Sequence, residues 1–232
     1  CLETGGVVDD LLVYKRGENN FFLVINAGNI DKDVAWILKQ AEAFDVFVDH
    51  QSDYYGEIAV QGPEAEAAVE EILNISCKEL EFYTFKTLEI STADGKETII
   101  VSRTGYTGED GFEIYASHSL TNSYWDKLVD AGVQPCGLGC RDTLRFEVGL
   151  PLYGDELSEE ITPIMASLGI FVKTDKEAFI GKSVLAEQKA NGVSKKIVGI
   201  ELADKAIPRH GYNVLNAEGE VIGEVTTGYN SI

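Results

Sequence analysis

Histidine and cysteine, from which many catalytic and metal sites are built, are scarce in this sequence. It has three histidines and four cysteines among 232 residues. His50, His118 and His210 are far apart and no motif surrounds them, so a histidine-based triad or a zinc hydrolase site is unsupported unless folding brings them together. Cys136 and Cys140 are spaced like half a metal clip, but no second pair or nearby histidine completes it. We expect no metal ion and interpret the cysteines as thiols in a reducing compartment.

Positive charge is also scarce. The sequence has 19 Lys and Arg residues against 39 Asp and Glu, which gives a net charge of -20. A nucleic-acid surface needs clustered Lys and Arg, so we expect no nucleic-acid partner. The segment from Lys173 to Arg209 is the one long stretch with more basic than acidic residues. A solvated surface is the ordinary interpretation of this segment, and a docking site for an acidic partner is the alternative.

Long apolar runs are missing as well. The longest candidate, Phe21 to Ala27, is the size of a strand and far short of the ~18 residues that cross a membrane, so we expect no membrane partner. The 44% apolar and 25% charged residues are typical of a globular protein. The chain begins at Cys1, not Met, and ends at Ile232 directly after a predicted strand. We therefore expect a piece of a longer protein, whose targeting segment would lie outside it.

Hydrophobic periodicity predicts an α+β fold. Alternation and turn residues predict strands at 7–14, 21–26, 46–48, 58–61, 88–91, 98–102 and 112–116, with a hairpin turn at 93–95. Helical spacing predicts helices at about 29–43, 63–73, 120–131 and 138–148. Beyond Gly154, short strands at 197–202 and 221–225, with a turn at 218–219, are separated by Gly, Pro and Asn. This last part indicates the start of a β-rich domain.

Two adjacent carboxylates, Asp9 and Asp10, lie in the predicted strand Val7 to Tyr14. Alternate side chains of a strand share a face, so at least one of the two must sit beside apolar neighbours. Burying a carboxylate without a partner is costly, which favours a functional role for one of them. The alternative is structural: one carboxylate binds backbone amides and the other faces water.

A glycine-rich stretch runs from Arg103 to Ile114. Its three glycines, at 105, 108 and 111, let the backbone turn tightly and approach a ligand. Tyr106 and Phe112 offer flat faces to an aromatic ring, and Glu113 can accept two adjacent N–H bonds, as from a pterin edge. The spacing fits neither a Rossmann fingerprint nor a P-loop. A hairpin loop without a ligand is the alternative.

A third stretch opens the helix predicted at 138–148. Asp142 and Arg145 are one turn apart and can pair. Arg141 lies in the first turn, where the helix dipole disfavours a cation, so a specific anionic partner would explain its place. A solvated arginine is the alternative.

Together these stretches resemble the T-protein family, the aminomethyltransferases of the glycine cleavage system. Each motif is modest, but the ordered set is specific and covers essentially the whole chain; the motifs are Gly5–Leu11, Val60–Pro63, Gly105–Glu113, Cys136–Arg145, Pro151–Gly154, Phe179–Lys182 and Ile207–Gly211. Cys140 stands where the family usually has Ala. A Tyr-containing segment and a basic residue of the folate pocket, expected in the family, lie outside this chain.

The resemblance implies both an architecture and a reaction. It implies folate-binding domains of mixed sheets and helices followed by a β-barrel-like domain: part of the second α+β domain at 1–54, a folate-binding α+β domain at 55–155, and an incomplete C-terminal domain at 156–232. The implied reaction moves the one-carbon unit of aminomethyl-lipoyl H-protein to tetrahydrofolate, giving 5,10-methylenetetrahydrofolate and ammonia. H-protein is the implied partner, and the implied compartment is the bacterial cytoplasm or the mitochondrial matrix.

The resemblance also assigns roles to residues. It makes Asp9, the first Asp of its motif, the catalytic residue. It makes Glu113 the residue that holds the pterin and Arg141 a contact to folate, with Tyr106 and Phe112 as further folate-binding residues.

Two other functions remain open. One is a paralogous folate-dependent demethylase, or the folate domain of a sarcosine or dimethylglycine dehydrogenase; the intact Asp9 and the absence of an FAD fingerprint argue against it. The other is a non-enzymatic folate-binding factor of iron–sulfur assembly. That group has a Lys-Gly-Cys-Tyr-type motif, whereas this chain has Phe179 to Lys182 and no such cysteine.

Overall fold

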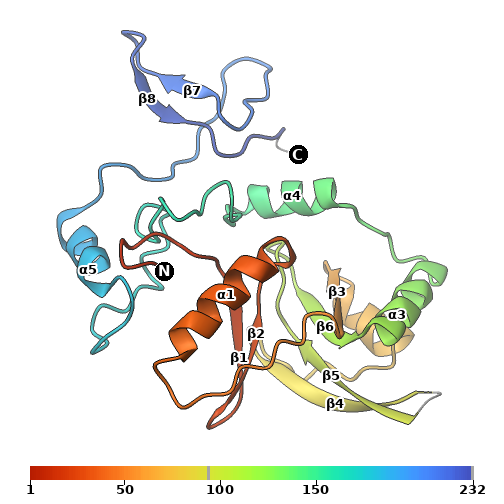
Figure 1. Cartoon of the computed structure of the whole chain (residues 1–232). Helices are drawn as coiled ribbons and strands as arrows, with labels where there is room; N and C mark the ends of the chain where they lie inside the picture. The colour runs from red at the N-terminus through yellow and green to blue at the C-terminus, as the bar shows by residue number, and fades with distance from the viewer. Residues whose placement is uncertain (93–94, 231–232) are drawn as a thin grey trace. The chain divides into compact units, whose positions relative to one another are not determined.

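The computed structural model (Figure 1) describes residues 1–92 and 95–230 and confirms the α+β prediction. Ala93 and Asp94, expected in a hairpin turn, lie outside the described residues. The chain forms two compact units, one made of Cys1–Val46 with Gly149–Ile232 and the other of Phe47–Val148. The finer division at 1–54, 55–155 and 156–232 stays a prediction. No helix within 1–92 and 95–230 is long and apolar enough to span a membrane.

The Phe47–Val148 unit is built on a four-stranded antiparallel sheet. The strands are β3 (Tyr55–Gln61), β4 (Phe85–Thr92), β5 (Gly95–Ser102) and β6 (Gly111–Ser117). Their order is β3-β6-β5-β4, and Ala59 of β3 is paired with Glu113 of β6. All four predicted strands of this region are confirmed, with ends a few residues longer than expected.

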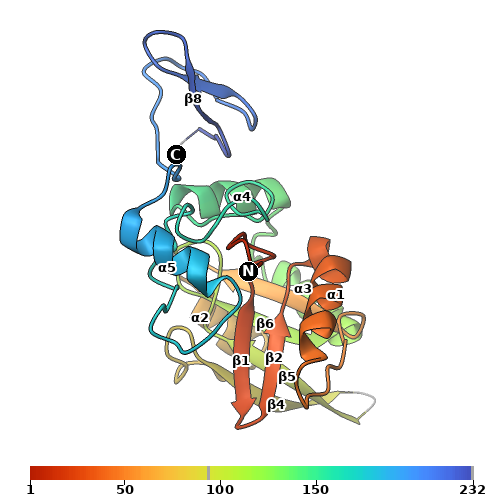
Figure 2. The same ribbon diagram turned by 60° about the vertical axis from the view of Figure 1, so that its left-hand side comes forward.

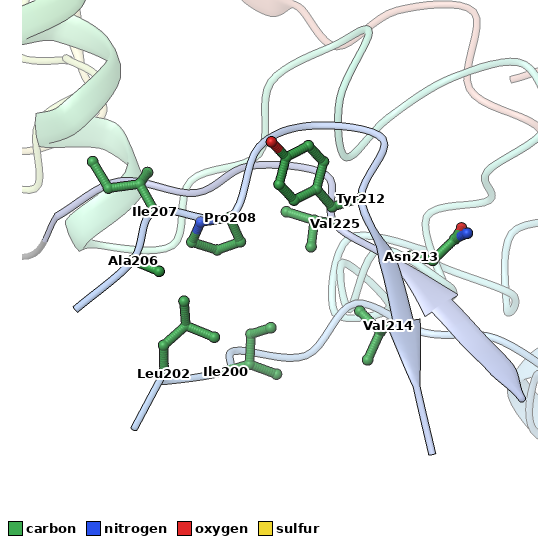
Figure 3. A pocket seen from close by; sticks show the side chains of 9 residues that line it. All are labelled: Ile200, Leu202, Ala206, Ile207, Pro208, Tyr212, Asn213, Val214 and Val225. Carbon is green, nitrogen blue, oxygen red and sulfur yellow. The ribbon is translucent and has the colours of Figure 1, made fainter. Parts of the chain in front are cut away.

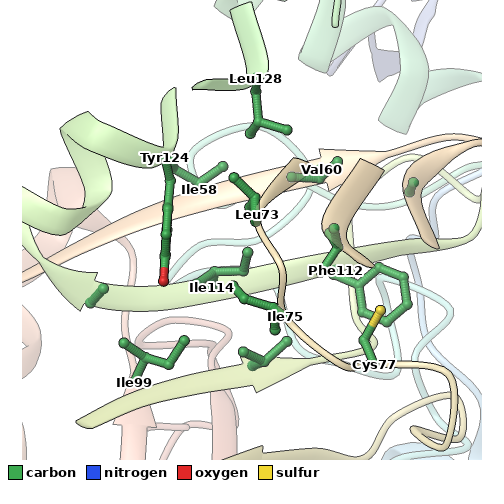
Figure 4. Close-up of a cluster of buried hydrophobic side chains, with 14 of the residues drawn as sticks. Ile58, Val60, Leu73, Ile75, Cys77, Ile99, Phe112, Ile114, Tyr124 and Leu128 are labelled. Atoms are coloured by element: carbon green, nitrogen blue, oxygen red, sulfur yellow. The ribbon is translucent and has the colours of Figure 1, made fainter. Parts of the chain in front are cut away.

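One face of this sheet packs on the main apolar core, drawn in Figure 4. Ile58, Val60, Phe112 and Ile114 point into it from β3 and β6. Fully burying side chains of this kind contributes about 1.5–3 kcal/mol each. A slip of one residue would turn them to the other face, so the core fixes the register of β3 on β6.

Helices cover the apolar face. Helix α3 (His118–Asp130) buries Tyr124 and Leu128, and the short α2 (Ala65–Ala67) continues into a π-helical turn, Ala68–Ile72. The Ser117 hydroxyl begins α3 by accepting a bond from the backbone N–H of Leu120 at 3.4 Å. Helix α4 (Leu138–Glu147) follows. The predicted helices 120–131 and 138–148 are confirmed, whereas the one at 63–73 is short and irregular.

The other unit contains the hairpin of β1 (Leu12–Gly17) and β2 (Asn20–Val24), the turn Ala27–Asn29 and α1 (Ile30–Ala41). Helix α1 runs beside this hairpin in both views (Figures 1 and 2). Later in the chain come α5 (Lys182–Asn191) and the small sheet of β7 (Asn213–Leu215) and β8 (Val221–Glu224).

Three predicted strands, two in this unit and one at the boundary between the units, need correction. The strand expected at 7–14 begins only at Leu12, so Asp9 and Asp10 lie in an irregular segment and the alternation argument for them is wrong. The segments 46–48 and 197–202 are also irregular. The strand expected at 221–225 and its turn are confirmed, with Gly219 at a φ of 84°. Only a two-stranded sheet represents the expected β-rich part among the described residues.

Candidate functional site

Backbone bonds from a distant part of the chain position Asp9. The Val7 N–H lies 2.9 Å from the Ser158 carbonyl oxygen and 3.1 Å from that of Ile161. A Cβ at Gly6 would overlap the Glu159 carbonyl oxygen, so only glycine fits there. The residues before Asp9 are therefore held by close packing on 158–161, and not by a strand ladder.

The Asp9 carboxylate accepts hydrogen bonds on both oxygens. Oδ1 lies 2.8 Å from the side-chain nitrogen of Asn26 and 2.9 Å from the backbone nitrogen of Asp10. Oδ2 lies 2.9 Å from the side-chain nitrogen of Asn29. Partial burial acts to raise the pKa of Asp9, but hydrogen bonds from Asp33, Asn26, Asn29 and Asp10 outweigh it and hold the pKa below its usual value. The group is thus a half-buried, ionised carboxylate.

Lys32 and Asp33 of α1, near the Asp9 segment, were not predicted from sequence as part of the site. Lys32 donates a hydrogen bond to the Val8 carbonyl, and its ammonium nitrogen lies 3.9 Å from the centre of the Tyr153 ring. Asp33 is 2% exposed, and burial together with Asp9 raises its pKa to about 6. A signal for Asp33 was present, because it shares the inward side of α1 with Ile30 and Ile37.

In the Phe47–Val148 unit, Glu113 lies on the sheet face opposite the core. It is 8% exposed, and its Oε2 accepts hydrogen bonds from the Thr104 hydroxyl and, at 3.2 Å, from the Tyr115 hydroxyl. Both hydroxyl groups donate to the same oxygen, Oε2. The two carboxylate oxygens therefore differ in their surroundings, whereas the sequence led us to expect two equivalent oxygens.

Glu57 is a second carboxylate on this face that sequence reasoning missed. It pairs with Tyr115 across β3 and β6, which makes it the diagonal neighbour of Glu113. The Glu57 side chain is exposed as a whole, but its carboxyl group is partly desolvated by the surrounding protein. This desolvation and the charge of Glu113 raise the pKa of Glu57 to about 7, although the charge of Arg141 lowers it. Near neutral pH the Glu57 carboxyl group can therefore hold or release a proton.

Arg141 and Tyr106 are brought together. The Arg141 guanidinium lies 4.8 Å from the centre of the Tyr106 ring, a cation–π arrangement. The charge of Arg141 also lowers the pKa of Glu57, which the charge of Glu113 raises. Arg141 thus interacts with Tyr106 through its ring and with the Glu57 carboxyl group through its charge. Asp9 belongs to the other unit.

Phe112 does not lie on this face. It is 0% exposed within the apolar core, and the Arg103 guanidinium lies 5.1 Å from its ring centre. Its place in the core fixes β6 and hence Glu113, and no ring face is open to a ligand. The glycines at 105 and 111 have a structural reason too, because a Cβ at either would overlap the Gln61 side chain.

No set of three or more His, Cys, Asp and Glu side chains in the described parts of the chain is arranged to hold a metal ion. A groove of about 300 Å³ near β7 and β8 is almost wholly apolar (Figure 3); its lining is Ile200, Leu202, Ala206, Ile207, Pro208, Tyr212, Asn213, Val214 and Val225. It offers no ionisable group suited to proton transfer.

Comparisons with known proteins show which family this chain belongs to. A family model described as the GCVT N-terminal domain matches residues 1–176. Proteins named aminomethyltransferase are 53% identical in Clostridium botulinum, over 100% of this chain and 63% of the relative, and 51% identical in Bacillus subtilis, over 100% and 64%. The chain therefore spans slightly less than two thirds of the length of these relatives.

A solved structure is also similar to this chain in sequence and in fold. The crystal structure of glycine cleavage system aminomethyltransferase T from Bartonella henselae is 33% identical, with a TM-score of 0.86 over 97% of this chain and 61% of that one. The family match extends over Asp9, Tyr106, Glu113 and Arg141. Because it covers well over half of the sequence, this chain belongs to the GCVT N-terminal domain family.

Proposed function

We propose that this chain is the folate-handling part of an aminomethyltransferase that forms 5,10-methylenetetrahydrofolate from tetrahydrofolate and aminomethyl-lipoyl H-protein. The observation that carries the proposal is the Asp9 carboxylate, which stays ionised and half-buried under hydrogen bonds from Asn26 and Asn29. The naming of the relatives as aminomethyltransferases favours this activity over a demethylase or a non-enzymatic folate-binding factor.

The reaction needs a fixed negative charge where a cation develops. A folate nitrogen bonds to the aminomethyl carbon, the bonds from that carbon to nitrogen and sulfur break, and the second folate nitrogen closes the ring. Two N–H protons of the folate leave with ammonia and the lipoyl thiol, so atoms balance. We assign Asp9 to stabilise the cationic carbon and to accept a folate proton, because preorganised charge and proton transfer act most strongly at such points.

We assign the polar face of the Phe47–Val148 unit to bind the folate. We assign Glu113 Oε1 to accept an N–H bond of the pterin, since Oε2 already binds Thr104 and Tyr115. We assign Arg141, stacked on Tyr106, to an anionic or ring-bearing part of the folate. No metal is required for either contact.

We further propose that H-protein docks on the segment Lys173–Arg209. Three of its lysines, at 173, 182 and 189, donate to backbone carbonyls and so have structural roles. Lys195 and Lys196 are exposed in a chain of net charge -20. These two are the best candidates for meeting an acidic partner. The bacterial relatives favour a cytoplasmic location.

The proposal is tested in the protein that carries this sequence, with Asp9→Asn and Glu113→Gln beside the control Asp31→Asn, an exposed carboxylate of α1. We expect Asp9→Asn to lower turnover by ~10²–10⁴-fold, as for loss of an electrostatic or proton-transfer group, with tetrahydrofolate affinity kept within about threefold. We expect Glu113→Gln to weaken tetrahydrofolate binding by roughly tenfold, the cost of about one hydrogen bond to a charged group.

Calorimetric titration measures the affinity, and assays with aminomethyl-lipoyl H-protein measure turnover. A loss of turnover below tenfold in Asp9→Asn would remove Asp9 from the catalytic role. An unchanged affinity in Glu113→Gln would make Glu113 a purely structural residue of β6.

A further inference from the structure

The ammonium group of Lys32 has three neighbours within its unit. It donates a hydrogen bond to the Val8 carbonyl, lies 3.9 Å from the centre of the Tyr153 ring and lies 3.2 Å from Oδ1 of Asp33. An ammonium group has three N–H bonds, so these three neighbours match its bonding capacity. Burial acts to lower the pKa of Lys32, but the interactions with Tyr153 and Asp33 outweigh it, and the group stays charged. Lys32 is therefore a cross-link between segments and not an amine free for chemistry.

The place of Lys32 in the first turn of α1 needs a physical reason, because the helix dipole disfavours a cation there. Asp33 supplies one reason, since it is 2% exposed and a buried carboxylate needs a partner. The ion pair with Asp33 does not explain the second contact, to the carbonyl of Val8, which lies 24 residues earlier in the chain. A counter-ion alone has no need to reach that carbonyl.

The Val8 carbonyl belongs to the peptide group that joins Val8 to Asp9. A peptide group is planar, so holding its oxygen also fixes the direction in which the chain continues to the Cα of Asp9. One residue earlier, the Val7 N–H is held by carbonyl groups within 158–161. Lys32 is thus the second of two supports on the backbone that leads into Asp9, and it is the support directly before the carboxylate.

The same end of α1 also holds the Asp9 carboxylate. Asn29 directly precedes the helix, and its side-chain nitrogen lies 2.9 Å from Oδ2 of Asp9. Lys32 follows three residues later, which is close to one helical turn, so both side chains leave the helix on nearly the same side. One rigid element therefore holds the backbone before Asp9 through Lys32 and the carboxylate through Asn29.

We propose that Lys32 is a positioning residue, which binds the Val8 carbonyl, holds the Val8–Asp9 peptide group against α1 and so fixes the direction of the Asp9 carboxylate. Lys32 acts through Asp9 and does not itself take part in the chemistry. The proposal rests on the proposed function only in taking Asp9 as the catalytic carboxylate.

The variants separate this role from that of a counter-ion. Lys32→Met keeps an unbranched apolar side chain and removes the ammonium group. By itself it would leave the buried Asp33 carboxylate without its ion pair, so it is made together with Asp33→Asn, and Asp33→Asn alone is the reference. Lys39→Met in the same background is the matched control, because Lys39 is an exposed lysine in the last turn of α1.

The first experiment needs no substrate. NMR spectra of ¹⁵N-labelled protein that carries this sequence record the side-chain amide signals of Asn29, whose N–H bonds to Asp9. Asp9→Ala in the reference background marks where these signals lie once that bond is lost. We expect Lys32→Met to move the Asn29 signals towards that position and Lys39→Met to leave them in place. Asn29 signals that Lys32→Met does not move would overturn the positioning role.

The second experiment measures turnover and tetrahydrofolate affinity. We expect Lys32→Met to lower turnover roughly 10- to 100-fold relative to the reference, since a misplacement of about 1 Å can cost that much, with affinity kept within about threefold. The loss should shrink to about twofold or less when Asp9→Asn is also present, because two residues that act through one interaction are not additive. No loss of turnover, or an equal loss with and without Asp9→Asn, would make Lys32 a purely structural residue.

Failure of the proposed function gives a different result. Asp9→Asn would then keep its turnover, while Lys32→Met would still move the Asn29 signals. The NMR measurement therefore tests the position of Asp9, and the comparison of turnovers tests what that position is for.

Discussion

Arg103 and Asp110 close the two ends of the glycine-rich loop with a two-pronged ion pair. The Arg103 Nε lies 2.8 Å from Oδ1 of Asp110, and Nη2 lies 2.6 Å from Oδ2. Arg103 also donates to the Leu80 carbonyl at 3.0 Å and to Glu66 at 3.1 Å. The loop that carries Tyr106 is therefore tied at both ends, independently of any ligand.

We expect Asp110→Asn to lower the free energy of unfolding by about 1–2 kcal/mol. This is less than the loss of a buried ion pair would cost, because water partly screens the exposed Arg103–Asp110 pair. Hydrogen bonding from Arg103 lowers the pKa of Asp110, so the stabilisation is present above the unfolded-state pKa near 4 and is lost as the pH falls below it. Urea unfolding at pH 7 and pH 3 measures this, with Asp126→Asn of α3 as the exposed control. Equal losses at both pH values would contradict the ionic explanation.

Glu57 should make the stability of the protein depend on pH near neutrality. Its pKa is raised from 4.5 to about 7, so the folded state binds a proton more tightly than the unfolded state does. Stability therefore falls as the pH rises from about 4.5 to about 7. We expect Glu57→Gln to be as stable as the wild type near pH 4.5 and more stable than the wild type above about pH 7. Glu79→Gln, an exposed control in the same unit, should not gain stability relative to the wild type as the pH rises. The midpoints of urea unfolding, measured for the wild type and both variants across this pH range, test the prediction.

Gly6→Ala should damage the Asp9 region far more than an alanine elsewhere. The new Cβ would overlap the Glu159 carbonyl oxygen, so the backbone must move, at a cost of roughly 3 kcal/mol or more for forced overpacking. Gly199→Ala is the control, because nothing lies within 4 Å of its Cβ. Thermal unfolding and tetrahydrofolate turnover are measured for both. A Gly6→Ala protein as stable as the control would show that residues 5–7 are not held against 158–161.

Lys195 and Lys196 should matter only for the encounter with H-protein. We expect Lys195→Gln with Lys196→Gln to raise the apparent Michaelis constant for H-protein about threefold or more at low salt, and to have little effect at 0.5 M salt, where screening is complete over ~4–5 Å. Lys15→Gln with Lys39→Gln, two exposed lysines outside the segment, serves as the control. A Michaelis constant that does not change at low salt would leave the segment as a solvated surface.

The elements that the sequence predicted well are those whose pattern is local. The β4–β5 hairpin and helices α1, α3 and α4 follow their periodicity within a few residues. The segment 7–11 shows the limit of that reasoning. Its sequence alternates like that of a strand, but the segment is irregular and the Val7 N–H bonds to the carbonyl groups of Ser158 and Ile161, and no local pattern can reveal partners so distant.

The same limit applies to the candidate site. Glu113 and Arg141 stand in recognisable motifs, and their neighbourhood with Tyr106 was expected. Glu57 was missed because its place beside Glu113 depends on the register of β3 against β6. Phe112 was placed wrongly because neighbouring residues of a strand point to opposite faces, so its ring lies in the core while Glu113 lies on the other face. Side chains beyond the motifs are found only when cross-strand partners are known.

The discontinuity of the unit that holds Asp9 has a consequence for the order of events during synthesis. Cys1–Val46 emerges from the ribosome before the rest of this chain, yet the carbonyl groups of Ser158 and Ile161 that hold Val7 are made only after the whole Phe47–Val148 unit. The continuous unit can fold as it emerges, whereas the segment around Asp9 must wait with its apolar residues uncovered. Contacts of such long sequence separation form slowly. The Asp9 carboxylate is thus among the last parts of the chain to reach its final environment, and a chain released early presents the polar face around Glu113 without it.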